Sequence, residues 1–347
     1  MRETVLKHLT IIVFAASTLP LIAAAESTPQ GMLTKAPAEN SDWIMPRTEY
    51  GHPDFQGTWL FGSRTPLQRP VGLGLKQTYS EDEAKALESK MRQHNMAQDM
   101  PLDPNRPAPE QGAAIGQEAD DGFLAHLRKP ELIKVHGEYR TSIIVDPADG
   151  RLPKRKGFKD FTAKLRAKGL QPSDGPEGQP LSGRCLMFGS AIPSLTPIMM
   201  NPNMQIVQNE NYVMIMTEMI NDARIIRLND EHFDHGIRNW MGDPVGTWEG
   251  DTLVVHSKNF RPDQSAMRSI VMSQELEVFE RYTLVGNDEI HYSFTVVDDQ
   301  AYTQPFTGER ILTRNSSNER IYEFACHEGN YSLAGILAGA RRLEADQ

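Results

Sequence analysis

Glu218 and Arg224 are the first residues of this chain whose types and positions suggest chemistry. Glu218 lies near the end of an apolar run, 212–219, that predicts a strand buried on both faces. An unpaired buried carboxylate is costly, and Arg224 follows a predicted turn at 220–223, where it could pair with Glu218. Two interpretations stay open: a structural ion pair, or a catalytic base of raised pKa that Arg224 tunes.

Histidines and acids gather at 230–235. His232 and His235 are three residues apart, and they could bind zinc or another divalent ion if their segment forms one helical turn. No spacing fixes a third ligand, and on a loop the same side chains would be ordinary polar surface. We therefore predict no cofactor, keep a divalent metal at these histidines as the alternative, and treat His235 as a candidate general acid.

The motif Cys-His-Glu-Gly-Asn-Tyr at 326–331 is predicted to follow the last strand, 320–326. Adjacent residues of a strand point to opposite sides, so at most one of His327 and Glu328 points inward. His327 is the second candidate acid. Trp240 suits the core as well as a ligand site. The mouth of a barrel is where a ligand would bind, and the predicted substrate-binding residues are Trp240, Asp222, Glu328 and Tyr331.

The only two cysteines are Cys185 and Cys326. In an oxidising compartment they would most simply pair, and there is no Cys-x-x-Cys that would favour a redox role. The chain-entropy model gives a disulfide that closes a loop of about 140 residues a stabilisation of roughly 4–5 kcal/mol. We predict a structural disulfide.

Residues 1–25 have the features of a secretory signal peptide. Arg2 and Lys7 precede an apolar stretch that ends in three alanines, 23–25. A membrane anchor is the alternative, but the stretch is short and contains Pro20. The predicted location is therefore periplasmic or secreted, with no membrane contact after cleavage.

The charge of the mature chain argues against nucleic acid as a partner. Removing Arg2, Lys7 and Glu3 changes the formal net charge from −10 to −11, and no basic block remains. The motifs of α/β-hydrolases, of zinc proteases of the His-Glu-x-x-His type, of c-type haem attachment and of dinucleotide binding are all missing from the sequence. The predicted partner is a small molecule.

The order of expected elements favours a mainly β fold. Short predicted strands follow one another from 204 to 326, separated by tight turns, as in an antiparallel barrel or sandwich. A strand with Trp59 is expected to cover one end of the core, and helices are predicted at 81–96, 158–168 and 332–343. We predict a flexible tail at 26–44 and one domain over 45–347, with long loops at 98–122 and 169–184.

Several motifs together resemble a large family of exported bacterial proteins without an established activity. They are Pro-Asp-Phe-Gln-Gly-Thr-Trp at 53–59, Ile-Ile-Val-Asp-Pro at 143–147, Gly-Arg-Cys at 183–185, Trp-Glu-Gly-Asp-Thr-Leu-Val-Val at 248–255, and the motif at 326–331. The resemblance covers nearly all of the mature chain. It implies one exported unit and no particular substrate. The Gly-x-Trp start also loosely resembles lipocalin-like barrels, a likeness that many β-barrels share.

Two functions fit these features. The first is a cofactor-independent enzyme, a lyase, isomerase or hydrolase, that acts on a small apolar or aromatic molecule. Glu218 would be its base, Arg224 would tune that base, and His327 or His235 would be the acid. The second is a non-catalytic binding protein for a hydrophobic small molecule. The sequence identifies neither the substrate nor the reaction nor the oligomeric state.

Overall fold

The computed structural model describes most of the chain beyond Trp43. The described residues are 43–98, 105, 132–187, 192–196, 201–219, 223–234, 236–262, 270–315 and 320–346. The predicted signal peptide, nearly all of the predicted tail and most of the predicted loop 98–122 lie outside them. Residues 36–347 belong to one compact unit.

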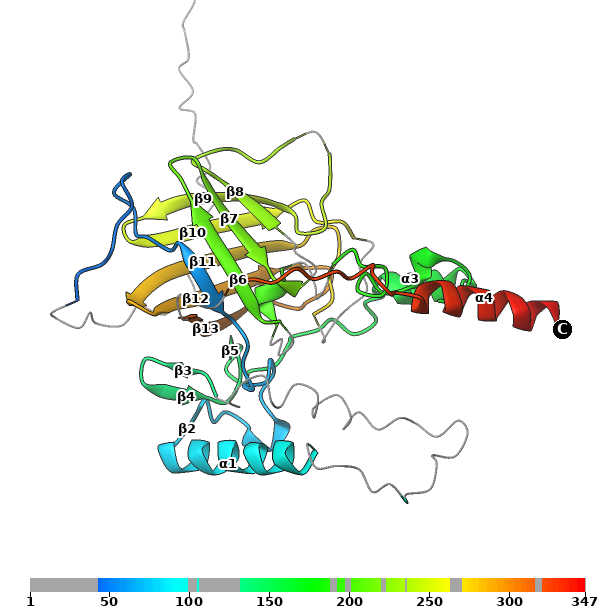
Figure 1. The fold of residues 1–347 in the computed structure, drawn as a ribbon, viewed down its shortest axis with the longest axis horizontal. Coiled ribbons are helices and arrows are strands. Elements are labelled where there is room, and N and C mark those ends of the chain that lie inside the picture. Colours follow the sequence, from blue (N-terminus) through cyan, green and yellow to red (C-terminus); the bar gives the residue numbers. More distant parts are fainter. Residues whose placement is uncertain are drawn as a thin grey trace, which may run out of the picture. The chain divides into compact units, whose positions relative to one another are not determined.

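A closed β-barrel forms the centre of this unit (Figure 1). Its strands follow the order β1-β6-β7-β8-β9-β10-β11-β12-β13, and β1 pairs with both β6 and β13 to close the ring of nine. A tenth strand, β5, pairs with β13. The predicted mainly β barrel with a few helices is confirmed. The strands are β1 (Gly57–Leu60), β5 (Ile144–Asp146), β6 (Asn203–Gln208), β7 (Tyr212–Thr217), β8 (Ala223–Leu228), β9 (Asp243–Glu249), β10 (Thr252–Lys258), β11 (Glu277–Gly286), β12 (Glu289–Val297) and β13 (Phe306–Arg314).

The odd number of strands has a topological consequence. A ring in which every neighbouring pair is antiparallel needs an even number of strands, so a ring of nine must contain a parallel pair. That pair is β8 and β9, which join at Arg227–Val245 and Leu228–Gly246. Parallel neighbours need a crossover connection, and residues 229–242 provide it. The predicted antiparallel barrel thus contains one parallel pair.

Large side chains fill the barrel interior. Along each strand alternate residues point inward, and these positions are mostly aromatic or branched. Trp59, Tyr282, Tyr292 and Phe294 are all buried, and the indole of Trp59 donates to the backbone oxygen of Phe55 at 2.8 Å. Around these four side chains the barrel interior is therefore a packed core.

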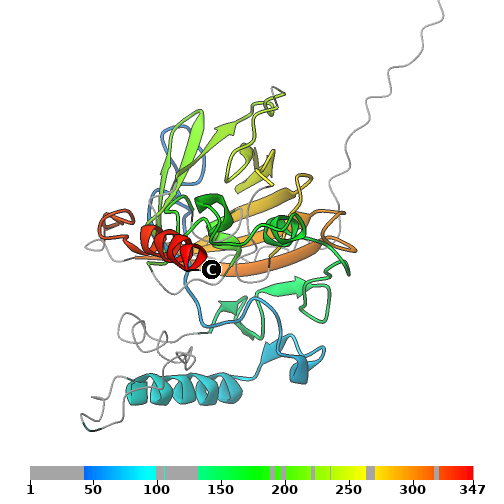
Figure 2. The ribbon, with the colours of Figure 1, turned by 90° about the vertical axis from the view of Figure 1, so that its right-hand side faces the viewer.

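A smaller sheet and three α-helices accompany the barrel in the described residues (Figures 1 and 2). Both views show α1 beside the small sheet. Ser80 and Glu83 form a capping box at the start of α1, each side chain bonding the other's backbone N–H. The elements are β2 (Thr78–Tyr79), β3 (Lys134–Val135), β4 (Glu138–Arg140), α1 (Glu81–Gln98), α3 (Phe161–Ala167), α4 (Ser332–Ala345) and the 3₁₀ turns η1 (Val71–Leu73), η2 (Pro176–Gly178) and η3 (Pro193–Leu195).

Two local predictions are wrong. Residues 320–326 form no strand, and β7 alternates buried with partly exposed residues rather than being buried on both faces. The predicted loop at 169–184 contains only turns and η2. None of the described helices is both long enough and apolar enough to cross a membrane.

Candidate functional site

A network of buried polar side chains crosses the barrel interior. Arg224 donates to both carboxylate oxygens of Glu280, at 3.0 and 2.5 Å, and to the Ser257 hydroxyl at 3.1 Å. The hydroxyls of Tyr282 and Tyr292 donate to Oε1 of the same carboxylate at 2.8 and 2.9 Å. Arg224 is 4% exposed and Glu280 is fully buried. Protein groups therefore satisfy this carboxylate from several sides.

The electrostatics of this network favour a structural role. Burial, and then the charge of Glu280, raises the pKa of Tyr282 and Tyr292 well above 10, so both phenols stay protonated donors. Burial alone would lower the pKa of Arg224, but Glu280 outweighs it and raises that pKa. Removing one partner of such a buried pair typically costs about 3–5 kcal/mol.

The predicted Glu218–Arg224 pair is wrong in its partners. Glu218 is buried, but its carboxylate accepts hydrogen bonds from the Asn203 amide and, at 3.3 Å, from the backbone N–H of Tyr322. The reason is the alternation of the strand. Arg224 pairs with Ile215 and points inward, and Glu218, an odd number of residues beyond Ile215, lies on the other face.

The crossover 229–242 builds a cleft against the outer face of β8. Alternate residues of that strand, Ala223, Ile225 and Arg227, face outward, and Arg227 packs its guanidinium over the Phe233 ring at 3.8 Å. The cleft has a volume of about 500 Å³. Its lining consists of Tyr212, Ala223, Arg224, Ile225, Arg227, Phe233 and residues 239–244, which include the predicted ligand residue Trp240.

A chain of hydrogen bonds runs from this cleft to the outer surface of β11. Asp243 lines the cleft and contacts Nδ1 of His232 at 3.2 Å. Nε2 of His232 lies 3.1 Å from Nδ1 of His256, and Nε2 of His256 lies 2.7 Å from Glu277 Oε2. Arg227 bonds the other oxygen of Asp243 at 2.7 Å. We call Asp243, His232, His256 and Glu277 the relay.

The proton count of the relay follows from its geometry. An ionised carboxylate only accepts, so Nδ1 of His232 and Nε2 of His256 each carry a proton. In two neutral rings the facing nitrogens then carry none. A hydrogen bond between them requires one further proton, which gives the imidazole pair a positive charge. The pair can therefore gain and lose a proton between two carboxylates.

The surroundings lower the pKa of His232 and of Asp243. Burial, and then the charges of His256 and Lys258, lowers the pKa of His232 in spite of Asp243. Burial alone would raise the pKa of Asp243, but hydrogen bonds from Arg227 and the Phe233 N–H outweigh it and hold that pKa below its usual range. Asp243 is thus ionised at neutral pH. The alternative of a metal at His232 and His235 required a helical turn there; residues 231–234 have no helical structure, and His235 lies outside the described residues.

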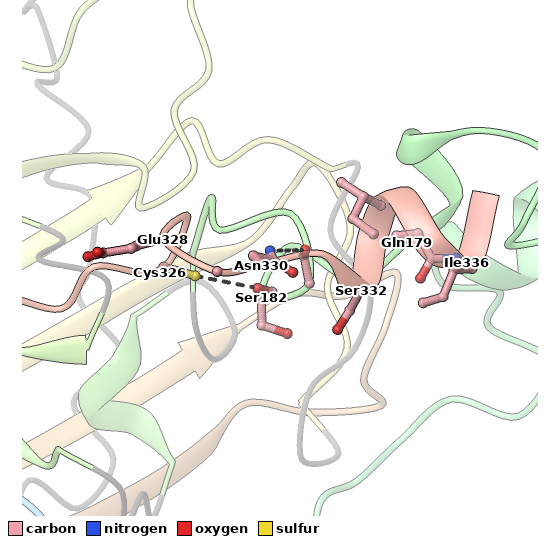
Figure 3. Close-up of a pocket in the computed structure, with 10 residues that line it drawn as sticks. Gln179, Ser182, Cys326, Glu328, Asn330, Ser332 and Ile336 are labelled. Atoms are coloured by element: carbon pink, nitrogen blue, oxygen red, sulfur yellow. Dashed lines mark hydrogen bonds between the residues drawn. The ribbon is translucent and has the colours of Figure 1, made fainter. Parts of the chain in front are cut away.

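The predicted disulfide between Cys185 and Cys326 is confirmed. It lies beside a pocket of about 360 Å³ that includes Glu328, Asn330 and the start of α4 (Figure 3). The Asn330 side chain donates to the backbone oxygen of Gly183 at 3.2 Å. His327 is exposed and does not line this pocket, and Tyr331 is 82% exposed.

The predicted site residues therefore do not meet in one place. Arg224 and Trp240 line the cleft, Glu328 lies at the disulfide, and Asp222 and His235 fall outside the described residues. Sequence reasoning missed residues that barrel closure brings together; for His256, Glu277 and Glu309 the only local signal was their outward phase in a strand. The missed residues are Asp243, His256, Glu277 and Glu280, and a second group, His136, His291 and Glu309, on the outside of β12 and β13.

No family model and no curated protein sequence matches this chain. The function of the site is therefore inferred from its residues and their geometry.

Proposed function

We propose that the protein is an enzyme of acid–base chemistry that acts on a small aromatic molecule bound in the cleft beside β8. The observation that supports this is the relay, whose first carboxylate lines the cleft. Tyr212, Phe233 and Trp240 offer aromatic surface to such a substrate. The disulfide is compatible with an exported protein, and the proposed location is periplasmic or secreted.

In the charged state of the relay, the proton on Nδ1 of His232 moves to Asp243 while Nε2 of His232 takes the shared proton from His256. Asp243 then gives its proton to the substrate. The reverse sequence removes a proton from the substrate and returns it to the imidazole pair. Glu277, whose side chain is 42% exposed, links His256 to solvent. Lyase, isomerase and hydrolase reactions all need such proton transfers.

The test is a screen of small aryl esters and aryl ketones, with ester hydrolysis followed by absorbance and deuterium uptake by the ketones followed by NMR in D₂O. The relay is broken by His256→Gln, which leaves the cleft lining intact. General acid–base groups contribute about 10²–10⁴-fold, so turnover should fall by at least about 10²-fold. His94→Gln, an exposed histidine on α1, is the matched control and should retain turnover.

Two results would count against the enzyme. Full turnover in both His256→Gln and Asp243→Asn would exclude the relay. The second candidate, a binding protein, is favoured by the aromatic lining of the cleft. It would be supported if aromatic acids quench Trp240 fluorescence while the wild type turns over none of the compounds.

A further inference from the structure

A group of two histidines and a glutamate lies outside the barrel, away from the relay residues. His291 of β12 and Glu309 of β13 sit on the outer face, since their neighbours Tyr292 and Arg310 point into the core. His136 reaches them from the turn between β3 and β4. One ligand atom from each of the three side chains lies within 4.8 Å of the other two.

The hairpin of β3 and β4 covers the outer face of the barrel at His291 and Glu309. The backbone N–H of Glu309 donates to the oxygen of Ile143 at 3.0 Å, and Arg140 of β4 contacts Oε1 of Glu309 at 2.7 Å. His291 is 4% exposed and Glu309 is 1% exposed as a result. His136 is exposed, so solvent and ions can reach the group from that side.

The polar contacts leave one face of the carboxylate toward the histidines. Arg140 holds Oε1, while Oε2 lies 3.1 Å from Nε2 of His291. Arg140 also contacts Glu138 at 3.0 Å, so two carboxylates surround one arginine. Arg140 therefore orients Glu309 beside the histidines, as a neighbouring group orients a metal ligand.

His136 takes a backbone conformation that residues other than glycine adopt uncommonly. His136 and Gly137 both have positive φ, 52° and 81°, in the two-residue turn between β3 and β4. Such turns favour Asn-Gly, and histidine is a less favourable first residue. The conformation aims the imidazole at His291, with ring centroids 5.0 Å apart.

We propose that His136, His291 and Glu309 bind one divalent cation of the zinc class. Two imidazoles and one carboxylate suit zinc and its first-row neighbours better than calcium or magnesium, which prefer oxygen ligands. Three protein ligands leave a coordination position open on the exposed side. The ion would connect the hairpin to the barrel wall through side chains of three separate strands or turns.

The test uses the full mature chain after treatment with EDTA and removal of the chelator. Zn²⁺ is added by calorimetric titration, and Co²⁺ is added in parallel to read the visible absorption of a tetrahedral site. The key variant is His136→Asn, because asparagine favours the turn conformation and the fold should survive. We expect one equivalent of Zn²⁺ in the wild type, and a loss of affinity of at least about tenfold in His136→Asn.

Two matched variants make the outcome specific. His94→Gln removes an exposed histidine on α1, and His256→Gln removes one imidazole of the relay, a second place in the described part of the chain where two imidazoles meet. Both should bind Zn²⁺ as the wild type does. Wild-type affinity in His136→Asn, stoichiometric binding that is lost only in His256→Gln, or no binding by the wild type would each overturn the proposal.

Discussion

At the scale of single residues, His232 makes stability depend on pH. Its pKa in the folded protein is lowered by burial and by His256 and Lys258, whereas in the unfolded chain it is about 6.5. The unfolded state therefore binds more protons between these two values, and stability falls as pH drops below about 6.5. In His232→Gln this loss should be smaller, by at most about 1.4 kcal/mol per pH unit.

Urea unfolding between about pH 5 and pH 7 measures this effect. The comparison with the variant is needed because His136, whose pKa is also lowered by burial, gives a slope of the same sign. The depressed pKa values of Asp243 and Glu277 act at lower pH, where those carboxylates protonate, and stay outside this window. Equal slopes in both proteins would rule out His232 as a source.

Residue types were predictable from the sequence, but their partners were not. The apolar run around Glu218 correctly marked a buried carboxylate, and Arg224 is indeed buried beside an acid. That acid is Glu280, which is 56 residues away in sequence and becomes a neighbour only when β8 and β11 face each other across the core. The disulfide was predictable because two cysteines allow one pairing.

At the scale of elements, Gly308 shows how tightly the wall of the barrel packs. It is directly opposite Phe294 in the β12–β13 ladder, and a Cβ atom at this position would lie 2.7 Å from Cε1 of that ring. We predict that Gly308→Ala destabilises the protein by about 1–3 kcal/mol through overpacking. Urea unfolding of the purified variant measures the change.

The control for this prediction is Gly286→Ala at the end of β11, where an added Cβ meets no atom within 4 Å. Its stability should change by no more than about 0.5 kcal/mol. If Gly308→Ala were as stable as this control, the Phe294 ring would have room to move and the packing argument would fail.

Most helices and strands could be predicted from the spacing of apolar residues and from helix-capping residues. The elements that could not be predicted have physical causes. β12, in which polar and apolar residues alternate along most of the strand, lies within the predicted run of strands from 204 to 326. β9 was missed because Pro244 and Gly246 interrupt its pattern, and Gly246 is needed where the side chain of Ile226 comes close. Residues 320–326 look like a strand but find no partner strand.

At the scale of the whole molecule, the candidate site follows from the way the barrel closes. Nine strands require a parallel pair, and the parallel pair requires the crossover 229–242. That crossover brings His232 against His256 and forms the cleft beside β8. Sequence patterns indicate strands and their faces, but the number of strands in a closed ring depends on long-range pairing that the patterns do not contain.

The disulfide connects the C-terminal segment, 320–346, to the turns around Cys185, and its removal should act on that segment first. Cys185 and Cys326 are 141 residues apart, which corresponds to about 4–5 kcal/mol of loop entropy. Residues 320–346 are mostly exposed, so without the bond they gain freedom in the folded protein too.

We predict that replacing both cysteines by serine lowers the free energy of unfolding by less than the about 4–5 kcal/mol of loop entropy. Hydrogen exchange should quicken at 321–331, including the Tyr322 amide, and stay slow in β11–β13. Faster exchange in those strands would instead show that the bond stabilises the barrel itself.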